Sequence, residues 1–407
     1  MNRWKKAAAA ILSAGIVLIL FLALQRLVEP KYADDILEGN FTSEYYNETT
    51  PHDVLFIGDC EVYENFDPIY LWKHFGITSY IRGNAQQLTW HSYYMLEDTL
   101  RYETPKAVIY NVQALTHAEP QREEYNRMAL DGMKWSKTKF DAIQASMCKG
   151  EHLLDYIFPL LRYHQRIFDL SGSDMTYYWN ARKVTHNGYY MRIDVLPVSE
   201  SDVADPTWLL GKPEEETPEE DEDTSMESDD LIDDPWGDIE GADEEEEENG
   251  NDTNMPALDD AGEGKPFGSY PLAYLEKIRI LCEEKGIQLI LIKAPSLAPQ
   301  WYSSDNDQVT AYAGKYNLPY INFYDLLEET GIDYETDTYD GGLHMNLNGA
   351  DKLSAYLGNR LAGQYGITDH RNDSELAAAY EKKVSFYEEM KQAQQEELDK
   401  YGEIKNY

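Results

Sequence analysis

Cysteine is scarce in this chain, and no pattern of metal ligands is present. The 407 residues include three cysteines, Cys60, Cys148 and Cys282. Three cysteines are too few for a disulfide framework, show no spacing typical of metal ligands, and leave at least one thiol free because their number is odd. We therefore predict no metal site and no cofactor. Cys282 stands at helical spacing from Leu275 and Ile278, which indicates a position in the core.

Positive charge is missing from residues 213–264. This stretch has 25 acidic residues and no Lys or Arg, so the rest of the chain carries only 15 of the 40 net negative charges. Both parts repel a phosphate backbone, and we expect no nucleic-acid partner. The stretch is also too poor in apolar residues to order itself, so we predict a disordered acidic loop over residues 213–265. Capture of divalent cations or of a polycationic partner is the alternative, although the spaced acid-and-glycine pattern of a calcium loop is missing.

A long hydrophobic run stands at the N-terminus. Arg3, Lys5 and Lys6 precede residues 7–24, which carry no charge. At 1.5 Å per residue this run nearly spans a hydrocarbon layer of about 30 Å, and the preceding cations favour a cytoplasmic N-terminus. A cleaved signal peptide begins in the same way, but its apolar core is usually shorter and ends in a small-x-small site that fits poorly here. We predict a cytoplasmic stub and an uncleaved, single-pass signal anchor over residues 1–28, with the rest of the chain outside the cell membrane.

Strand and helix signals alternate in two blocks beyond a polar, turn-rich segment, 29–50, that we predict to be a stalk. The apolar stretches that we expect to be strands cover residues 53–58, 77–81, 105–112, 287–295 and 318–323. Helical patterns separate them, two of which are expected to end at Gly76 and Gly286, and such alternation implies a parallel sheet with helices on its faces. We therefore predict a flavodoxin-like three-layer α/β/α domain built from residues 51–115 and 266–370.

Two further segments flank the second block. Residues 116–212 are aromatic and mixed in character, and we interpret them as a cap inserted beside the sheet. Residues 371–407 are charged and favour a helix with apolar residues on one face. This C-terminal helix either lies on the domain or forms a coiled coil, and the sequence leaves both open.

Residues with chemical potential follow the predicted strands. The turn Gly58-Asp59-Cys60 follows the first strand, and Asp340 and His344 lie in a glycine-rich loop before the last helix. Loops after the carboxyl ends of parallel strands gather on one edge of the sheet, where binding and catalytic groups collect. A catalytic histidine needs an acceptor that orients one ring nitrogen while the other takes a proton from the nucleophile. We therefore predict that Cys60, Asp340 and His344 are catalytic; a surface histidine in a glycine-rich turn is the alternative.

These motifs resemble those of the SGNH, or GDSL-type, hydrolases. That family has a Gly-Asp-Ser turn after its first strand and an Asp-x-x-His loop before its last helix. The segment IGDCEVYENF matches the first block with Cys60 in the serine position, and YDGGLHMNLNGADKLS matches the last, with one extra residue that Gly341 and Gly342 can absorb. The resemblance covers residues 51–115 and 270–366. It is strongest to membrane-anchored, extracytoplasmic SGNH-like proteins of bacteria, including acyltransferases of cell-envelope glycans and the lipoteichoic-acid D-alanylation factor.

The resemblance also implies roles for residues near the predicted nucleophile. Gly58 and Asp59 would form the nucleophile turn. The second block, RGNAQQ, matches loosely, and the third, YNVQAL, lacks the usual Gly-x-Asn-Asp. The residues that we assign to the oxyanion hole or to substrate binding are Gly83, Gln86, Asn111 and Gln113.

The resemblance implies an extracytoplasmic esterase or O-acyltransferase that acts on cell-envelope glycan or on acyl esters of small molecules. A membrane partner that supplies the acyl group is part of that expectation. A thiol beside a histidine and a helix N-terminus has a lowered pKa, which favours a nucleophilic Cys60. The alternative is a catalytically inactive protein that binds glycan or assists envelope assembly, in which Cys60 is simply a small buried residue.

Overall fold

A computed structural model describes residues 3–30, 37–172, 174–176, 183–198 and 265–405. Apart from Lys265, the predicted acidic loop lies outside the described residues. So do residues 31–36 of the predicted stalk and residues 173, 177–182 and 199–212 of the predicted cap.

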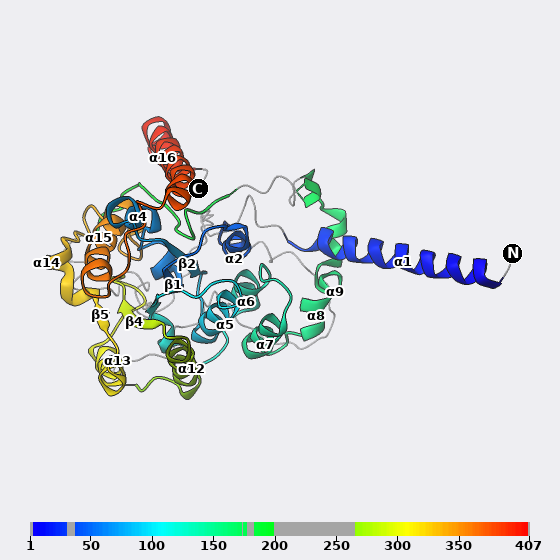
Figure 1. The fold of residues 1–407 in the computed structure, drawn as a ribbon, viewed down its shortest axis with the longest axis horizontal. Helices are drawn as coiled ribbons and strands as arrows, with labels where there is room; N and C mark the ends of the chain where they lie inside the picture. Colours follow the sequence, from blue (N-terminus) through cyan, green and yellow to red (C-terminus); the bar gives the residue numbers. More distant parts are fainter. Residues whose placement is uncertain (1–2, 31–36, 173, 177–182, 199–264, 406–407) are drawn as a thin grey trace, which may run out of the picture.

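The core of the protein is a five-stranded parallel sheet (Figure 1). Its strands are β1 (Val54–Gly58), β2 (Ser79–Gly83), β3 (Ala107–Asn111), β4 (Gln288–Lys293) and β5 (Tyr320–Asn322). They lie in the order β2-β1-β3-β4-β5, with Val54 opposite both Ser79 and Ala107, and with Ala107 opposite Gln288. This is the order of flavodoxin-like sheets. The pairing of β3 with β4 joins the two sequence blocks into one sheet, as predicted.

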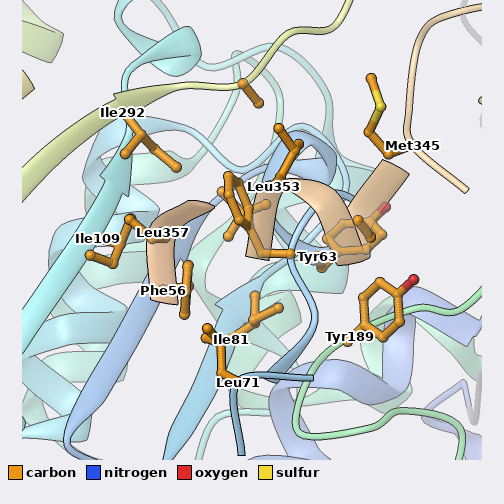
Figure 2. Packing of buried hydrophobic residues seen from close by; sticks show 14 of the residues in the cluster. Phe56, Tyr63, Leu71, Ile81, Ile109, Tyr189, Ile292, Met345, Leu353 and Leu357 are labelled. Carbon is orange, nitrogen blue, oxygen red and sulfur yellow. The ribbon is translucent and has the colours of Figure 1, made fainter. Parts of the chain in front are cut away.

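Helices cover both faces of this sheet because successive strand residues point in opposite directions. Val54 and Phe56 belong to one buried cluster, and Leu55 and Ile57 belong to another. The first face carries α4 (Pro68–Phe75) and α15 (Leu347–Gly363), and the second carries α5 (Thr89–Thr99), α12 (Ser269–Lys285) and α13 (Ser303–Tyr316). Figure 2 shows Phe56 of β1 in the same cluster as Leu353 and Leu357 of α15.

Local signals set the ends of these helices. The side chain of Asp67 accepts hydrogen bonds from Ile69 N (2.7 Å) and Tyr70 N (3.0 Å) at the start of α4. Gly76 and Gly286 end α4 and α12 with φ of 68° each, a left-handed conformation that glycine adopts without steric cost. Both glycines were predicted to end helices at these positions.

The first part of the region interpreted as a cap is helical, whereas its described residues 183–198 contain no helix. Following η3 (Gln113–Thr116), it contains α6 (Glu123–Leu130), α7 (Lys137–Ser146), α8 (Leu153–Ile157), α9 (Pro159–Tyr163) and η4 (His164–Phe168). Leu130 of α6 and Ile143 of α7 form a buried cluster with Trp90 and Met95 of α5. The helical region therefore packs against one layer of the domain.

The two ends of the chain differ in how they meet the domain. Helix α1 (Arg3–Val28) projects from the body in Figure 1; its apolar window is long enough to cross a membrane and is unburied. Helix α16 (Ser374–Tyr401) instead lies on the domain, where Tyr380 stacks on Trp72 with ring centroids 4.1 Å apart. The sequence left open whether this helix lies on the domain or forms a coiled coil, and in the structure it lies on the domain.

Part of the segment predicted as a stalk is packed. It contains η1 (Leu37–Asn40), α2 (Phe41–Glu44) and η2 (Tyr45–Asn47). The aromatic rings of Phe41 and Tyr45 are buried in the two clusters that flank the sheet. Residues 37–47 therefore contribute to the core, and they do so because aromatic side chains are spaced among the polar ones. The remaining short helices, η6 (Phe323–Leu326) and α14 (Leu327–Thr330), follow β5.

Candidate active site

The turn after β1 presents Cys60 at the carboxyl edge of the sheet. Asp59 has an extended backbone, and its Oδ1 accepts a hydrogen bond from Glu61 N at 3.2 Å. The chain then enters the four-residue helix α3 (Cys60–Tyr63). Gly58 pairs with Gly83 of β2, so Gly83 lies directly beside this turn. The half-buried Cys60 thus stands on a turn that is fixed by the sheet and by the Asp59 cap.

The loop before α15 brings an acid and a histidine to the same place. His344 N donates to Asp340 Oδ1 (2.8 Å), and His344 Nδ1 lies 2.6 Å from Asp340 Oδ2. Between them, Gly341 and Gly342 have φ of 77° and 97°, which other residues rarely adopt. These two glycines allow the backbone to fold back, so that one carboxylate holds both the histidine backbone and its ring.

The side chains of Cys60 and His344 interact, and each shifts the pKa of the other: His344 lowers that of the thiol, and Cys60 raises that of the ring. Asp340 occupies Nδ1 of the ring, which leaves Nε2 as the nitrogen available to the thiol. The structure therefore places Cys60, His344 and Asp340 in a continuous chain of contacts. Of the residues that sequence reasoning named as catalytic, all three come together.

Asn65, which sequence reasoning missed, connects the two loops. Its Oδ1 accepts from Met345 N at 2.7 Å, and its Nδ2 donates to Ser296 Oγ at 3.3 Å. Met345 follows His344 directly and is buried with Leu353 in the cluster of Figure 2. Asn65 thereby holds the histidine loop at a fixed distance from the turn that carries Cys60.

Glu64 is a second carboxylate beside the histidine, and sequence reasoning missed it as well. Its Oε2 lies 3.6 Å from His344 Nδ1 and accepts a hydrogen bond from the Tyr339 hydroxyl. Burial raises the pKa of Glu64 to about 7, although His344 and Tyr339 act in the opposite direction. Burial lowers the pKa of His344, but the charge of Glu64 and the hydrogen bond that Nδ1 donates to Asp340 are among the interactions that raise it above its ordinary value. The site thus stabilises the positive charge that the ring acquires when it takes a proton.

The expected lowering of the Cys60 pKa is wrong for this structure. Burial raises the pKa of the thiol to about 11, and the charges of Asp59 and Glu64 add to the rise. His344 lowers it by its charge and its hydrogen bond, but by less than burial raises it. The helix that follows has only four residues, so its dipole is small. In the resting site the thiol therefore keeps its proton.

A buried polar network lies beneath the nucleophile turn. Lys293 Nζ is 2.8 Å from both carboxylate oxygens of Glu61, and neither side chain is exposed by more than 2%. Asn111 Nδ2 donates to Glu61 Oε2 (2.9 Å) and to Asp59 Oδ1 (3.2 Å), while Asn111 Oδ1 accepts from Ala294 N. The network ties β3 and β4 to the turn that carries Cys60.

This network determines which residues are free to bind an oxyanion. Both amide hydrogens of Asn111 are engaged by Asp59 and Glu61, so Asn111 supports the turn instead of facing a substrate. Gln86 is exposed, with φ of 47°. Gln113 is buried, and neither its Nε2 nor its Oε1 has a hydrogen-bond partner among the described residues. Of the residues that the resemblance assigned here, Gly83 and Asn111 adjoin the turn, and no described contact joins Gln86 or Gln113 to Cys60.

The same cluster is where the described residues come closest to a metal-binding set. Ligand atoms of Glu64, Asp340 and His344 all lie within 4.8 Å of one another. A cation there would compete with the hydrogen bond between His344 and Asp340, because both use Nδ1. The groups present therefore suit either a metal or a histidine base, but not both together.

The fold and the site together define a class: an α/β protein with a doubly wound parallel sheet and a Cys-His-Asp constellation at its carboxyl edge. Comparison of the whole chain with protein-family models, with curated proteins and with solved structures gives no match. Function must therefore be argued from the site itself.

Proposed function

We propose that this protein is an SGNH-type acyl-transfer enzyme, an esterase or O-acyltransferase, with Cys60 as nucleophile, His344 as base and Asp340 as the group that orients it. The observation that carries the proposal is the position of His344 between both partners: its Nδ1 lies 2.6 Å from Asp340 Oδ2, and its ring interacts with the side chain of Cys60. The nucleophile after β1 and the acid-histidine loop before α15 have the chain order that the family resemblance implies. The strand order β2-β1-β3-β4-β5 is compatible with that fold.

In the first step of this proposal, His344 Nε2 takes the Cys60 proton as Sγ attacks the carbonyl carbon of an acyl ester. The S–C bond forms, the C–O bond breaks, and the leaving oxygen receives the proton from His344. A thioester on Cys60 and an alcohol result. In the second step His344 accepts the proton of a glycan hydroxyl or of water, whose oxygen attacks the thioester carbon. The Cys60 thiolate leaves and recovers its proton from His344.

The resting pKa values fit such a relay in one respect. The proton leaves the thiol only as the carbonyl carbon accepts the sulfur electron pair, so a thiol pKa of about 11 slows but does not prevent attack. The imidazolium formed in this step is stabilised by Asp340 and Glu64, which surround Nδ1 at 2.6 Å and 3.6 Å. The two carboxylates therefore favour the charged form that the transition state creates.

The proposal also sets a location and a substrate class. Helix α1 anchors the chain in the cell membrane, the domain lies outside, and the substrate is a cell-envelope glycan or an acylated small molecule. A membrane protein that carries the acyl group across is the expected donor. A reporter that functions only outside the cytoplasm, fused after Tyr407, should give signal in the membrane fraction. A soluble product that lacks residues 7–24 would contradict the anchor.

The alternative is a protein of this fold that binds glycan or assists envelope assembly without catalysis. Two observations favour it: burial holds the Cys60 thiol protonated, and the amide of Asn111 is engaged inside the protein. Loss of one oxyanion donor typically costs about 10²–10³ in rate. Both functions use the same edge of the sheet, so reactivity of Cys60 separates them.

The deciding experiment is mass spectrometry of the detergent-solubilised full chain after brief exposure to an aryl acetate or to iodoacetamide. We expect an acyl adduct on Cys60, and alkylation of Cys60 that is faster than that of Cys148. His344→Ala should slow acylation by about 10²-fold or more, and Asp340→Asn should slow it less. Cys60→Ser keeps an oxygen nucleophile and should retain part of the activity. If Cys60 reacts no faster than Cys148, and His344→Ala does not change its rate, the binding function is favoured over the enzyme.

A further inference from the structure

Large apolar side chains gather on one exposed segment next to α1. Outside α1, the described residues include 13 exposed large hydrophobic side chains, and six of them lie between residues 154 and 175. They form what we call the α8–η4 patch: Leu154, Phe158, Leu161, Ile167, Phe168 and Met175. Phe168 is 88% exposed, and Leu154 and Leu161 are more than half exposed. Single exposed apolar residues are normal on a protein surface, but a cluster within 22 residues indicates a contact with something apolar.

The opposite side of the same segment is fixed to the domain. The rings of Tyr156 and Tyr163 are buried, and the Arg127 guanidinium of α6 lies 3.6 Å from the centroid of Tyr156 and 5.5 Å from that of Tyr163. Tyr156 also belongs to the buried cluster that joins α5, α6 and α7. Because one side is held in this way, the patch residues point outward as a consequence of the fold.

The patch is continuous with α1. The rings of Phe21 and Phe158 are 6.2 Å apart, Leu160 N donates to Gln25 Oε1 at 2.6 Å, and Arg166 Nη1 donates to Val28 O at 2.8 Å. Figure 1 shows α8 and α9 beside the inner end of α1. These contacts fix the level of the patch along the helix axis. Phe158 lies beside Phe21, about one helical turn inside the apolar run that ends at Leu24.

We infer that the α8–η4 patch lies in the surface of the lipid bilayer that α1 crosses, as a second, non-spanning membrane contact. A helix that spans the hydrocarbon layer places Phe21 about 5 Å below its end, and Phe158 with it. Amphipathic segments with Phe and Leu on one face enter a bilayer to a depth of about 5–10 Å. The contacts of Phe158, Leu160 and Arg166 with α1 place the patch at a depth that agrees with this range. The inference goes beyond the proposed chemistry and rests on α1 crossing a membrane.

A second contact changes what the anchor does. Helix α1 alone leaves the domain free to tilt about its inner end, whereas α1 and the patch together fix its orientation to the bilayer. Because the chain has a net charge of −40, attraction to anionic lipid does not account for the contact, and burial of apolar side chains is the expected driving force. Neutral phosphatidylcholine vesicles are therefore sufficient for the test.

The test uses the full chain in phosphatidylcholine vesicles with a polarity-sensitive NBD fluorophore on one introduced cysteine. Leu161→Cys and Phe168→Cys report on the patch, and Ile280→Cys is the matched control: an exposed apolar residue of α12 on the body of the domain. Each is made with Cys60→Ala and Cys148→Ala; Cys282 is buried. We expect the two patch labels to emit at shorter wavelength and to lose most of their emission to nitroxide lipids labelled near the headgroup, while the control changes little.

Three results would overturn the inference. Patch labels that behave like the Ile280→Cys label would show that the patch stays in water. The same labels can be measured in native membranes. Emission that shifts to shorter wavelength there, but is not quenched by nitroxide lipids, would show that a protein and not lipid covers the patch. Release of the chain from the vesicles by a wash with alkaline carbonate would show that α1 does not span the bilayer. None of these results depends on acylation of Cys60, so the proposed chemistry is tested separately.

Discussion

At the scale of single residues, the site is dominated by carboxyl groups held away from water. Burial raises the pKa of Asp59 and of Glu64 to about 7 each, although the two side chains differ in their partners. The charge of Glu61 raises the pKa of Asp59 further, and the charge of Lys293 offsets this rise only in part. Such values near neutrality are common where a fold maintains a reactive site at the expense of stability. The stability of the protein should therefore depend on pH through these groups.

Asp59 gives the clearest pH dependence. The unfolded carboxyl has its ordinary pKa of 3.8 and the folded one a pKa of about 7, so the folded state binds more protons between these values. Raising the pH through this window therefore lowers the free energy of unfolding, by up to about 4 kcal/mol at 1.36 kcal/mol per pH unit. Asp59→Asn keeps the oxygen that caps α3 and removes the titration. Urea unfolding at pH 5 and pH 8 should show a smaller loss of stability for Asp59→Asn than for the unmodified chain. The exposed control Asp399→Asn should leave the pH dependence unchanged; equal slopes for all three proteins would contradict the assignment.

The buried pair of Lys293 and Glu61 gives a second residue-scale prediction. Lys293→Met leaves the Glu61 carboxylate without its cation, 2.8 Å away in the native protein, and should lower the free energy of unfolding by about 3–5 kcal/mol. The double variant Glu61→Gln/Lys293→Met removes both charges and should lose clearly less. Denaturant titration followed by far-UV circular dichroism measures the difference. A double variant as unstable as the single one would mean that shape, not charge, makes Lys293 necessary.

At the scale of elements, the sequence correctly predicted the helix ends and strands that short-range interactions determine. Gly76 and Gly286 end helices where they were predicted to, because a left-handed residue after a helix is a short-range requirement. The apolar runs around Val54 and Ile290 are strands of a parallel sheet, because runs of that length are typical of strands buried on both faces. The packed residues 37–47 were not expected, since what buries Phe41 is contact with residues distant in the sequence.

The turn between β1 and α3 depends on the absence of a side chain at Gly58. A Cβ there would overlap Val62 Cγ2 and lie 3.0 Å from Asn111 Cβ. Gly58→Ala should therefore cost about 1–3 kcal/mol of stability by crowding. Gly314→Ala is the matched control: nothing lies within 4 Å of its added Cβ in the last turn of α13, so it should stabilise by up to about 1 kcal/mol.

Thermal unfolding of the two glycine variants checks this prediction. Combining Gly58→Ala with Val62→Ala removes the atom that the new methyl group meets, and should recover part of the loss. If the loss of stability in the double variant equals the sum of the losses in the two single variants, crowding against Val62 is not the cause.

The site itself was predictable from the sequence only in part, because some of its contacts join residues that are distant in the sequence. Cys60 and His344 carry local motifs, a strand-to-helix turn and a glycine-rich loop, and the topology of a parallel sheet brings such loops together. Glu64 and Asn65 carry no motif, because their roles come from contacts with residues 231 or more positions away. The engagement of Asn111 by Asp59 and Glu61 is likewise a tertiary contact. Sequence could indicate the loops that meet, but not which carboxylates would share the histidine.

At the scale of the whole molecule, two halves of the sequence make one domain. β1, β2 and β3 come before the acidic stretch, and β4 and β5 come after it. The halves are joined by five register pairs between β3 and β4, from Ala107 opposite Gln288 to Asn111 opposite Ile292. The site is divided in the same way, with Cys60 in the first half and His344 in the second. The proposed chemistry at Cys60 therefore requires the two halves to stay together, even if the chain between them is cut.

This arrangement predicts the outcome of cleavage between the halves. Residues 213–264 are rich in Glu, and their composition predicts that a Glu-specific protease cuts there first. Because β3 and β4 pair in the interior of the sheet, the two fragments should elute together in size-exclusion chromatography in detergent and separate only in concentrated urea. Alkylation of Cys60 should remain faster than that of Cys148 in the cleaved protein, since no described contact of the site involves the cut segment. Fragments that separate without denaturant would mean that each half folds alone, and would contradict the single sheet on which the site depends.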